Sequence, residues 1–367
     1  MHTRLMNLAI GLLLALAIVE LAVALVRRKK VHSLRDTASS IAMGIGQQTV
    51  NVYLASGFLG LYALVHGRFG VFTMDRGTWW HWVLLVLGCD LAFYTGHRTA
   101  HSVNLFVAGH VVHHQAEDFN LLSSLRQGWA AWVQMFPFYL PLAIAGFPLE
   151  MLVQGQVAIM CAQFLSHYGA SRVDLGVLDR IFVTPRNHRV HHGFGPRYGG
   201  ANCGGLLVVW DRLFGSYVEE DEADPVVIGN GLTLNFHDPI EAHVDYYRRI
   251  WFVARRRQGF GKVSIWFSSP AVLYRELRRL GYESPSALNR SAASRADARL
   301  VVVWVTVCIA LFALHRAMYD HHGAIVRVAT GASMLAALVV LGRLLSGWRP
   351  FAAARAQTAG RAEIEAA

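Results

Sequence analysis

The sequence predicts an all-α protein, namely a polytopic membrane bundle of about five to seven transmembrane helices with a histidine-rich helical cap on the cytoplasmic side. Composition is the first reason, because 54% of the 367 residues are hydrophobic and 16% are charged, whereas soluble domains average about 25% charged residues. The second reason is that the apolar residues form long runs, and the third is that histidines gather in four short groups. The four cysteines include no CxxC pair, which excludes a disulfide scaffold and a zinc ribbon.

Seven apolar segments are long enough to cross, or nearly cross, a hydrocarbon core of about 30 Å. They cover residues 5–26, 38–66, 79–96, 129–146, 149–168, 300–317 and 324–345. The first is followed by the basic run 27–30 and has no small-residue cleavage site, so we expect a retained membrane helix and not a signal peptide. Only a Gly-Phe-Pro turn separates the fourth segment from the fifth, so a re-entrant hairpin is the alternative to two full spans.

The distribution of lysine and arginine predicts the orientation, because basic loops stay in the cytoplasm. Residues 27–35 and 248–299 are the basic segments. When the helices alternate in direction from these inner segments, every basic loop lies on the cytoplasmic side. The inner segments then include 97–128, 169–299 and the C-terminal tail, and the outer loops are 67–78 and 318–323. Topology thereby accounts for the net charge of +10, and no nucleic-acid partner is expected.

Eight of the 18 histidines have the spacing of metal ligands, and a ninth, His167, stands alone. Residues three or four apart share one face of an α-helix, so each multi-histidine group presents its rings in one direction. The predicted topology puts all nine on one membrane face, and burying so many imidazoles without charge partners or metals is costly. We therefore predict that the set binds metal, although a histidine like the one in FLSHYG would by itself suit an interfacial role. The predicted ligands are His97, His101, His110, His113, His114, His167, His188, His191 and His192.

The number of ligands predicts at least two metal ions, since one first-row ion accepts about six ligands and an active ion leaves a position open. Imidazole suits zinc, copper, iron and nickel, so ligand type leaves the metal open. The HExxH signature of zinc hydrolases is absent, because no glutamate follows the first histidine of any group. A redox-active pair in an apolar protein suggests O2 activation and attack on an unactivated C–H bond of a lipid, with iron as the natural candidate. A zinc-dependent membrane protein without redox chemistry is the competing class.

The three multi-histidine boxes HRTAH, HVVHH and HRVHH resemble, in type and order, those of the fatty acid hydroxylase and sterol desaturase superfamily of membrane di-iron oxygenases. The run from Asp90 to Tyr217 is similar in more detail. The stretch HVVHHQAEDFNLLSSLRQ, which carries Glu117, Asp118, Asn120 and Arg126, resembles the alkylglycerol monooxygenase branch, whose members cleave ether lipids with a pterin reductant. TPRNHRVHHG and NCGGLLVVWDRLFGSY are similar to the same branch.

This resemblance implies two non-haem iron ions held by the nine histidines, O2 as co-substrate and a membrane lipid as substrate. The lipid would be an ether lipid, a fatty acyl chain, an ornithine lipid or a sterol-like molecule, because bacterial ornithine-lipid hydroxylases belong to the same superfamily. A reduced pterin or a redox partner protein would supply electrons, since the sequence has no GxGxxG dinucleotide fingerprint. Desaturation by the same centre is an open alternative, and a prokaryotic chain would lie in the inner membrane.

The apolar segments, the composition and this resemblance together divide the chain into four parts. Residues 1–78 are predicted to form N-terminal membrane helices, and 79–220 a catalytic core of the fatty acid hydroxylase type. Residues 221–298 are a cytoplasmic basic segment that ends in a linker over 286–298, and 299–367 form the C-terminal membrane helices and tail.

Five polar residues are candidates to support the metal ligands or the substrate. Asp90 lies two helical turns before His97 on the same face, where a carboxylate can orient an imidazole, with an arginine ion pair as the alternative. Glu117 and Asp118 can orient imidazoles, bind a metal or bind a polar head group. Asn120 and Asn202 are candidates through the resemblance, and a turn role is the alternative for Asn202 and, similarly, for Asn187 and Asp211.

Three positions depart from the family pattern. Gly200 and Cys203 stand where relatives commonly have aspartate and tyrosine, which affects the surroundings of Asn202. Ser171 stands where some relatives have a further histidine. The centre therefore holds nine ligands, or takes water or a carboxylate as the tenth.

Overall fold

The computed structural model describes residues 2–170, 174–229, 237–282, 297–319 and 323–346. Every regular element in these ranges is helical, and extended segments meet only in isolated bridges such as Phe182 with Leu207. The predicted all-α class is thus confirmed. In chain order the elements are α1 (His2–Val26), α2 (Leu34–Phe69), α3 (Trp79–Ser102), α4 (Asn104–His114), the 3-10 helix η1 (Leu121–Leu125), α5 (Ala131–Met135), η2 (Phe136–Tyr139), α6 (Leu140–Ile144), α7 (Leu149–Leu165), η3 (Gly176–Arg180), α8 (Pro185–His191), α9 (Val209–Leu213), α10 (Pro239–Ala254), α11 (Gly261–Phe267), α12 (Pro270–Arg279), α14 (Ala298–Tyr319) and α15 (Ala324–Leu345).

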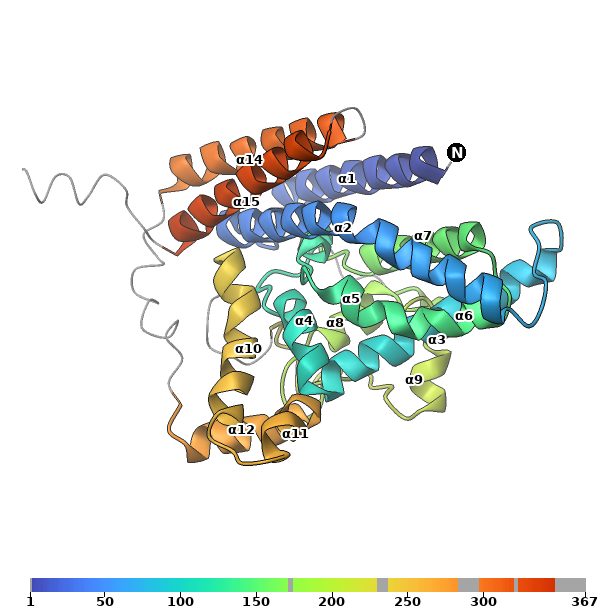
Figure 1. Cartoon of the computed structure of the whole chain (residues 1–367). Coiled ribbons are helices and arrows are strands. Elements are labelled where there is room, and N and C mark those ends of the chain that lie inside the picture. The colour runs from blue at the N-terminus through green and yellow to red at the C-terminus, as the bar shows by residue number, and fades with distance from the viewer. Residues whose placement is uncertain (1, 171–173, 230–236, 283–296, 320–322, 347–367) are drawn as a thin grey trace, which may run out of the picture.

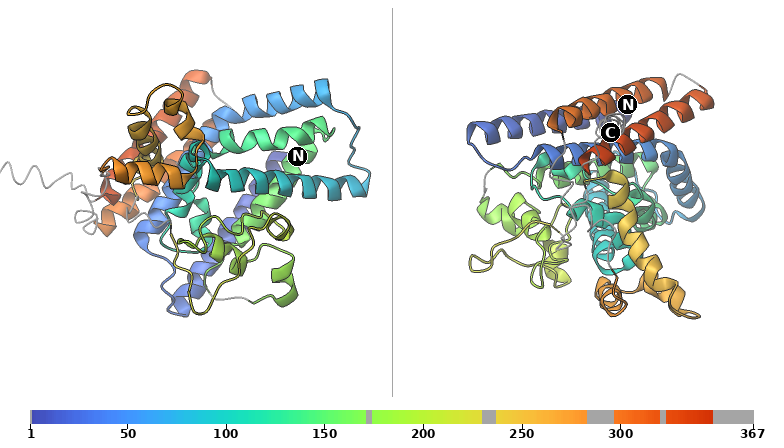
Figure 2. Two further views of the ribbon diagram at one scale, coloured as in Figure 1. Left: turned by 90° about the horizontal axis from the view of Figure 1, so that it is seen from below. Right: turned by 90° about the vertical axis from the view of Figure 1, so that its left-hand side faces the viewer.

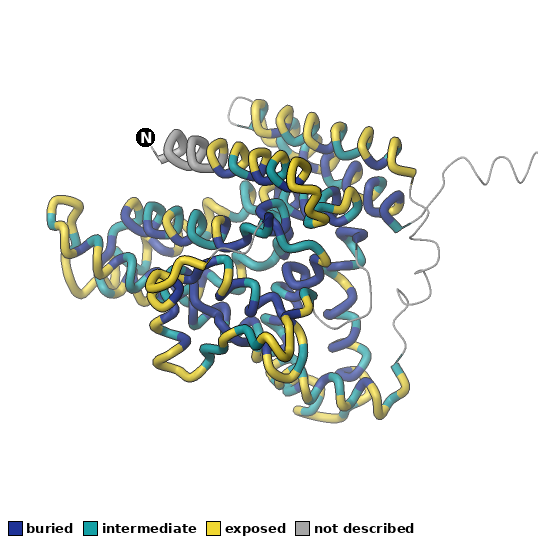
Figure 3. The backbone as a smooth tube through the Cα atoms, turned by 180° about the vertical axis from the view of Figure 1, so that it is seen from behind, coloured by how far each residue is buried: buried dark blue, intermediate teal, exposed yellow. Residues whose placement is uncertain are grey.

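Helices α2, α14 and α15 are long and apolar enough to cross a membrane, and they contain three of the seven predicted spans. They pack side by side as one layer, seen at the top of Figure 1. Exposed positions line the outer surface of this layer (Figure 3). Many of them carry apolar side chains, such as Val302, Ile309 and Val328, and lipid removes the cost of exposing these. These three helices indicate an integral, multi-pass membrane protein. Shorter apolar helices cover Gly11–Val26, Ala131–Ile144 and Leu149–Leu165.

The predicted segment 129–146 is divided into α5, η2 and α6, which follow one another without forming a single helix. Pro137 and Pro141 explain the division, because proline lacks a backbone N–H and crowds the preceding turn. Gly146 then turns the chain into α7 with φ of 93°, and a Cβ there would meet the carbonyl oxygen of Phe72. Helices α5 to α7 thus form a hairpin. This hairpin packs beside the second half of α2 and against α3, around a core that includes Tyr62 and Leu85 (Figure 2).

A buried ion pair joins α2 to the polar half of the molecule. Arg126, which follows η1, and Asp36, near the start of α2, are both almost fully buried, with guanidinium and carboxylate 3.2 Å apart. The same guanidinium donates to the hydroxyl of Ser39 and, through Nε, to the carbonyl oxygen of Val112 in α4. Because each group is buried and hydrogen-bonded, the pair fixes α4 against α2.

Glu20 gives α1 a comparable attachment. Its carboxylate is buried and accepts hydrogen bonds from the backbone N–H groups of Leu121 at 2.7 Å, Gly169 at 2.7 Å and Ala170 at 3.3 Å. One carboxylate in an apolar helix thereby holds together two segments that are far apart in the sequence. Both segments adjoin predicted metal ligands.

We predict that Glu20→Ala destabilises the protein by about 2 kcal/mol, because it leaves buried N–H groups without acceptors. The measurement is thermal unfolding of the purified protein in detergent. Glu150→Ala is the control, since Glu150 is about half exposed in its ion pair with Arg76 and such surface pairs contribute little. Equal unfolding temperatures for the two variants would contradict the anchoring role.

Candidate metal centre

Four separate segments bring the nine predicted ligands together. His97 and His101 lie one turn apart at the end of α3, α4 carries the next three, His167 follows α7, and α8 with its C-terminal cap carries the last three. Their nitrogen atoms form two sets, and within each set the candidate ligand atoms lie within 4.8 Å of one another. The five-histidine set is His97, His101, His110, His114 and His191, and the four-histidine set is His113, His167, His188 and His192.

The HxxHH spacing distributes each box over both sets. In α4, His110 and His114 are four residues apart and join the five-histidine set, while His113 joins the other. In the second box, His188 and His192 join the four-histidine set and His191 joins the other. The sets are direct neighbours, since the rings of His114 and His192 are 4.6 Å apart.

Ring nitrogens face one another at the distances expected of ligands to a common ion. Nε2 of His97 lies 3.0 Å from Nε2 of His110, and Nε2 of His113 lies 3.3 Å from Nε2 of His167. Two imidazoles bound to one ion at right angles, with bonds of about 2.1 Å, place their nitrogens about 3 Å apart. Nε2 of His101 and of His191 is buried without a hydrogen-bond partner among the described residues. The geometry and the donor atoms therefore fit a metal in each set.

Backbone carbonyl groups orient several of the rings. Nδ1 of His97 donates to the carbonyl oxygen of Cys203 at 2.9 Å. Nδ1 of His113 donates in the same way to Arg126 at 3.0 Å, and Nδ1 of His191 to Ala201 at 2.7 Å. A carbonyl oxygen only accepts, so Nδ1 carries the proton and Nε2 is left with its lone pair. This is the outer hydrogen bond that metal-bound histidines usually make.

Burial also keeps the ligands neutral. Desolvation lowers the pKa of His191 to about 4 and, together with neighbouring rings, holds the pKa of His113, His114 and His192 well below 6.5. Neutral imidazole is the form that binds metal. Burial therefore favours the form of these rings that can bind a metal ion.

Asp90 and Asp211 hold the loop that receives His97. Asp90 is buried and accepts from the N–H groups of Leu206 at 2.6 Å and Leu207 at 3.0 Å and from the indole of Trp210 at 2.9 Å. Asp211 accepts from the N–H groups of Cys203 and Gly204, each at 2.8 Å. Both carboxylates thus act on a ligand through the loop, since the carbonyl of Cys203 accepts from His97.

The other polar candidates support the segments around the sets. Asp118 accepts from the N–H of Ser33 at 2.6 Å, and Glu117, whose side chain is 60% exposed, lies 4.0 Å from Nε2 of His237. Asn120 caps η1 and accepts from the N–H of Ser123 at 2.9 Å. Neither metal set includes a carboxylate from the described residues.

Asn202 is the one non-glycine residue besides Arg28 with positive φ in the described chain, at 51°. Its amide donates to the carbonyl oxygens of Asn187 at 3.1 Å and Val218 at 2.8 Å. This arrangement joins α8 to the loop after α9. Ser171, the position of a further histidine in some relatives, lies outside the described residues.

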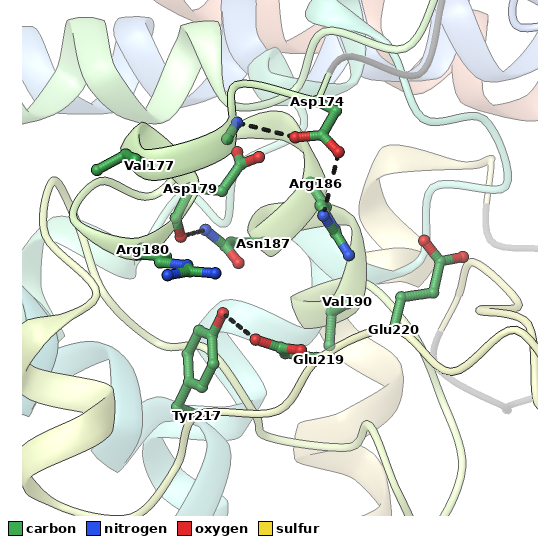
Figure 4. A pocket seen from close by; sticks show the side chains of 11 residues that line it. Asp174, Val177, Asp179, Arg180, Arg186, Asn187, Val190, Tyr217, Glu219 and Glu220 are labelled. Carbon is green, nitrogen blue, oxygen red and sulfur yellow. Dashed lines mark hydrogen bonds and ion pairs between the residues drawn. The ribbon is translucent and has the colours of Figure 1, made fainter.

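One polar cavity of about 320 Å³ reaches a predicted ligand. His101, Arg98, Gly200 and Ser216 are among its lining residues, so the glycine that departs from the family pattern borders the opening. A second cavity of about 380 Å³ lies beside α8, lined by charged residues that include Asp174, Arg180 and Arg186 (Figure 4). None of the nine histidines lines this second cavity.

The fold and the site define a helical membrane protein with two adjacent histidine clusters that could hold metal ions, and comparisons with known proteins place the chain in a family. The family described as fatty acid hydroxylase matches residues 82–216. Human alkylglycerol monooxygenase is 31% identical over 315 residues, which cover 84% of this chain and 68% of the human protein. The Xenopus tropicalis protein of that name is 32% identical over 238 residues, or 65% of this chain and 52% of the relative. The chain thus spans between about half and two thirds of these relatives.

The ornithine lipid hydroxylase OlsE of Rhizobium tropici is 30% identical over 138 residues, covering 37% of this chain and 41% of that protein. No solved structure matches the chain significantly. The chain belongs to the fatty acid hydroxylase family, which confirms the resemblance inferred from the histidine boxes. Homology to a monooxygenase and a lipid hydroxylase identifies it as an oxidoreductase, and its two histidine sets are consistent with a di-metal site.

We predict that Asp211→Ala weakens metal binding about 10–100-fold, the usual effect of removing a residue that orients a ligand from outside the first shell. The loop at Cys203 loses two hydrogen bonds, so the carbonyl that accepts from His97 is no longer held. Titration with a competing chelator measures the affinity. Asp221→Ala, which removes an exposed surface ion pair with Arg197, should leave the affinity unchanged, and a similar loss in this control would argue against a specific effect.

The stability of the metal-free protein should fall as the pH is lowered from about 6.5 to about 4. Unfolded histidines have a pKa of about 6.5, and the folded rings have lower values, so the unfolded state binds more protons in this range. Unfolding temperatures at pH 7.5 and pH 5, with and without metal, test this. A pH-independent unfolding temperature for the metal-free protein would contradict the burial of neutral rings.

Proposed function

We propose that this protein is a membrane-bound di-iron oxygenase that hydroxylates a lipid with O2 and two electrons from an external reductant. The observation that carries the proposal is the pair of adjacent, buried sets of five and four histidines in a chain homologous to lipid oxygenases. Iron bound there would supply the activation of O2 for attack on a C–H bond.

The composition of the two histidine sets favours iron over the competing hypothesis of a zinc-dependent protein. Structural zinc sites are closed with four ligands, and catalytic ones use three protein ligands and a water. A set of five imidazoles exceeds that number. A hydrolase would also require a general base beside the metal, and the sets include no carboxylate from the described residues. Imidazole suits iron and zinc alike, so the preference for iron rests on the number of ligands and on the missing base.

The chain's own residues would fix the ligands and separate the reactants. Carbonyl groups from Cys203, Arg126 and Ala201 hold three rings in one tautomer. The polar cavity beside His101 offers a route for a small polar reactant, and we infer that the lipid approaches from the membrane side. We place the centre on the cytoplasmic face, with α1, α3 and the α5–α7 hairpin completing a bundle of five to seven spans.

The relatives' names guide the substrate and the reductant. An ether lipid is the first substrate to test, followed by ornithine lipids, fatty acyl lipids and sterols. A reduced pterin or a redox partner protein would donate the electrons. Desaturation is the alternative outcome of the same chemistry, and mass spectrometry separates the two, because hydroxylation adds one oxygen atom and desaturation removes two hydrogen atoms.

Elemental analysis of the purified protein is the direct test of the metal centre. We expect about two iron ions per wild-type chain, as two ligand sets require, and loss of iron in His191→Ala. His66→Ala is the matched control, because His66 contacts the carbonyl of Gly146 and belongs to neither set. Zinc alone, persisting after reconstitution with iron, would contradict the proposal.

Oxygen consumption with reductant and lipid then tests the reaction. The iron-loaded wild type should consume O2 well above a His113→Ala/His191→Ala double variant, which loses one ligand from each set. The His66→Ala control should behave as the wild type. Equal consumption by the wild type and the double variant would contradict the oxygenase.

A further inference from the structure

The segment from α10 to α12 carries an unbalanced positive charge. Residues 246–275 contain seven arginines and lysines and no aspartate or glutamate. Three of the seven are paired with acids at or beyond the ends of this range: Arg248 with Glu241 at 3.1 Å, Arg249 with Asp245 at 2.5 Å, and Arg257 with Glu276 of α12 at 3.7 Å. Arg255, Arg256 and Lys262 are exposed and form no ion pair with a described residue. A strong positive field therefore surrounds the start of α11.

The same segment exposes large apolar side chains. Phe260 is 81% exposed, Phe267 60% and Val263 50%, and their spacing of three and four residues places them on one face of α11. Trp251, at the end of α10, is also 60% exposed. Exposing several such side chains to water is unfavourable, so this face requires a partner.

The opposite face of α11 is fixed to the metal-binding part of the molecule. Ile265 is fully buried in a cluster with Val107 and Val111 of α4. Asn104, the first residue of α4, is also buried and donates from its side chain to the carbonyl of Ile265 at 2.8 Å, while its oxygen accepts from Tyr246 of α10 at 2.9 Å. The helix that carries three predicted ligands is therefore attached directly to the exposed apolar face, as the lower part of Figure 1 shows for α4, α10 and α11.

We propose that this face of α11 rests on the surface of an anionic lipid bilayer, in the same membrane that holds α2, α14 and α15. Aromatic and aliphatic side chains that point outward beside unpaired cations are typical of helices that lie in the membrane interface. Anionic head groups would neutralise the cations, and the apolar side chains would enter the boundary of the acyl chains. The contact residues are Arg255, Arg256, Phe260, Lys262, Val263 and Phe267.

This contact would set the height and tilt of α4 relative to the lipid. It does not depend on the identity of the metal or on the reaction, so it can be tested separately from the proposed oxygenase. An acidic soluble protein is the other partner that the charge would suit. The exposed aromatic side chains favour the bilayer.

Depth-dependent fluorescence quenching tests the contact in the full chain. Val263→Cys is labelled with an environment-sensitive dye and placed in lipid nanodiscs, with Glu222→Cys, an exposed residue of the 221–225 turn, as the matched control. Spin-labelled lipids should quench the dye at 263 several-fold more than the dye at 222, with a blue-shifted emission at 263. Phe267→Cys provides a second position on the same face.

Changing the charge of the lipid separates the contribution of the cations from that of the apolar side chains. Quenching at 263 should be stronger with phosphatidylglycerol present than with phosphatidylcholine alone, and Arg255→Gln/Arg256→Gln/Lys262→Gln should remove this difference. Equal, weak quenching at 263 and 222 in both lipids would overturn the proposal and leave the face to a soluble partner. Quenching at 263 that is insensitive to lipid charge would overturn the role assigned to the cations.

Discussion

The close packing of nine neutral imidazoles, seven of them buried and His101 and His110 half-buried, is the constraint on which the structure depends, because several face each other nitrogen to nitrogen. Facing lone pairs at 3.0–3.3 Å are unfavourable unless a proton or a cation lies between them. Four chain segments must stay in place to keep the rings in that arrangement. Buried polar contacts outside the sets help to hold these segments, including those of Asp90, Asp211 and Arg126.

The membrane helices contribute to the centre through single buried charges. Glu20 is buried in the apolar helix α1 and Asp36 is buried near the start of α2, and both carboxylates accept hydrogen bonds from segments that lie next to the ligands. A charge at such a position is costly unless it is fully paired. The pairing orients the polar half of the protein on the membrane helices. Hydrophobic contacts alone would fix this orientation less well, because they are not directional.

The sequence predicted the helical class, the membrane character and the gathering of the nine histidines, because helical spacing and long apolar runs are local signals. It did not predict what the carboxylates contact. Asp90 shares a helix face with His97, yet its partners are the N–H groups of residues 206 and 207, more than 100 residues away. The sequence around Glu20 does not indicate its partners, which are the N–H groups of Leu121, Gly169 and Ala170. The division of segment 129–146 followed from its two prolines, a local signal that hydropathy alone does not register.

The interleaving of the two HxxHH boxes has a consequence for loading. Adjacent residues such as His113 and His114 belong to different sets, as do His191 and His192, so α4 and α8 each serve both positions. An ion bound in one position would order the same backbone that the other position needs, so the ordering cost would be incurred once and binding at the two positions would be cooperative.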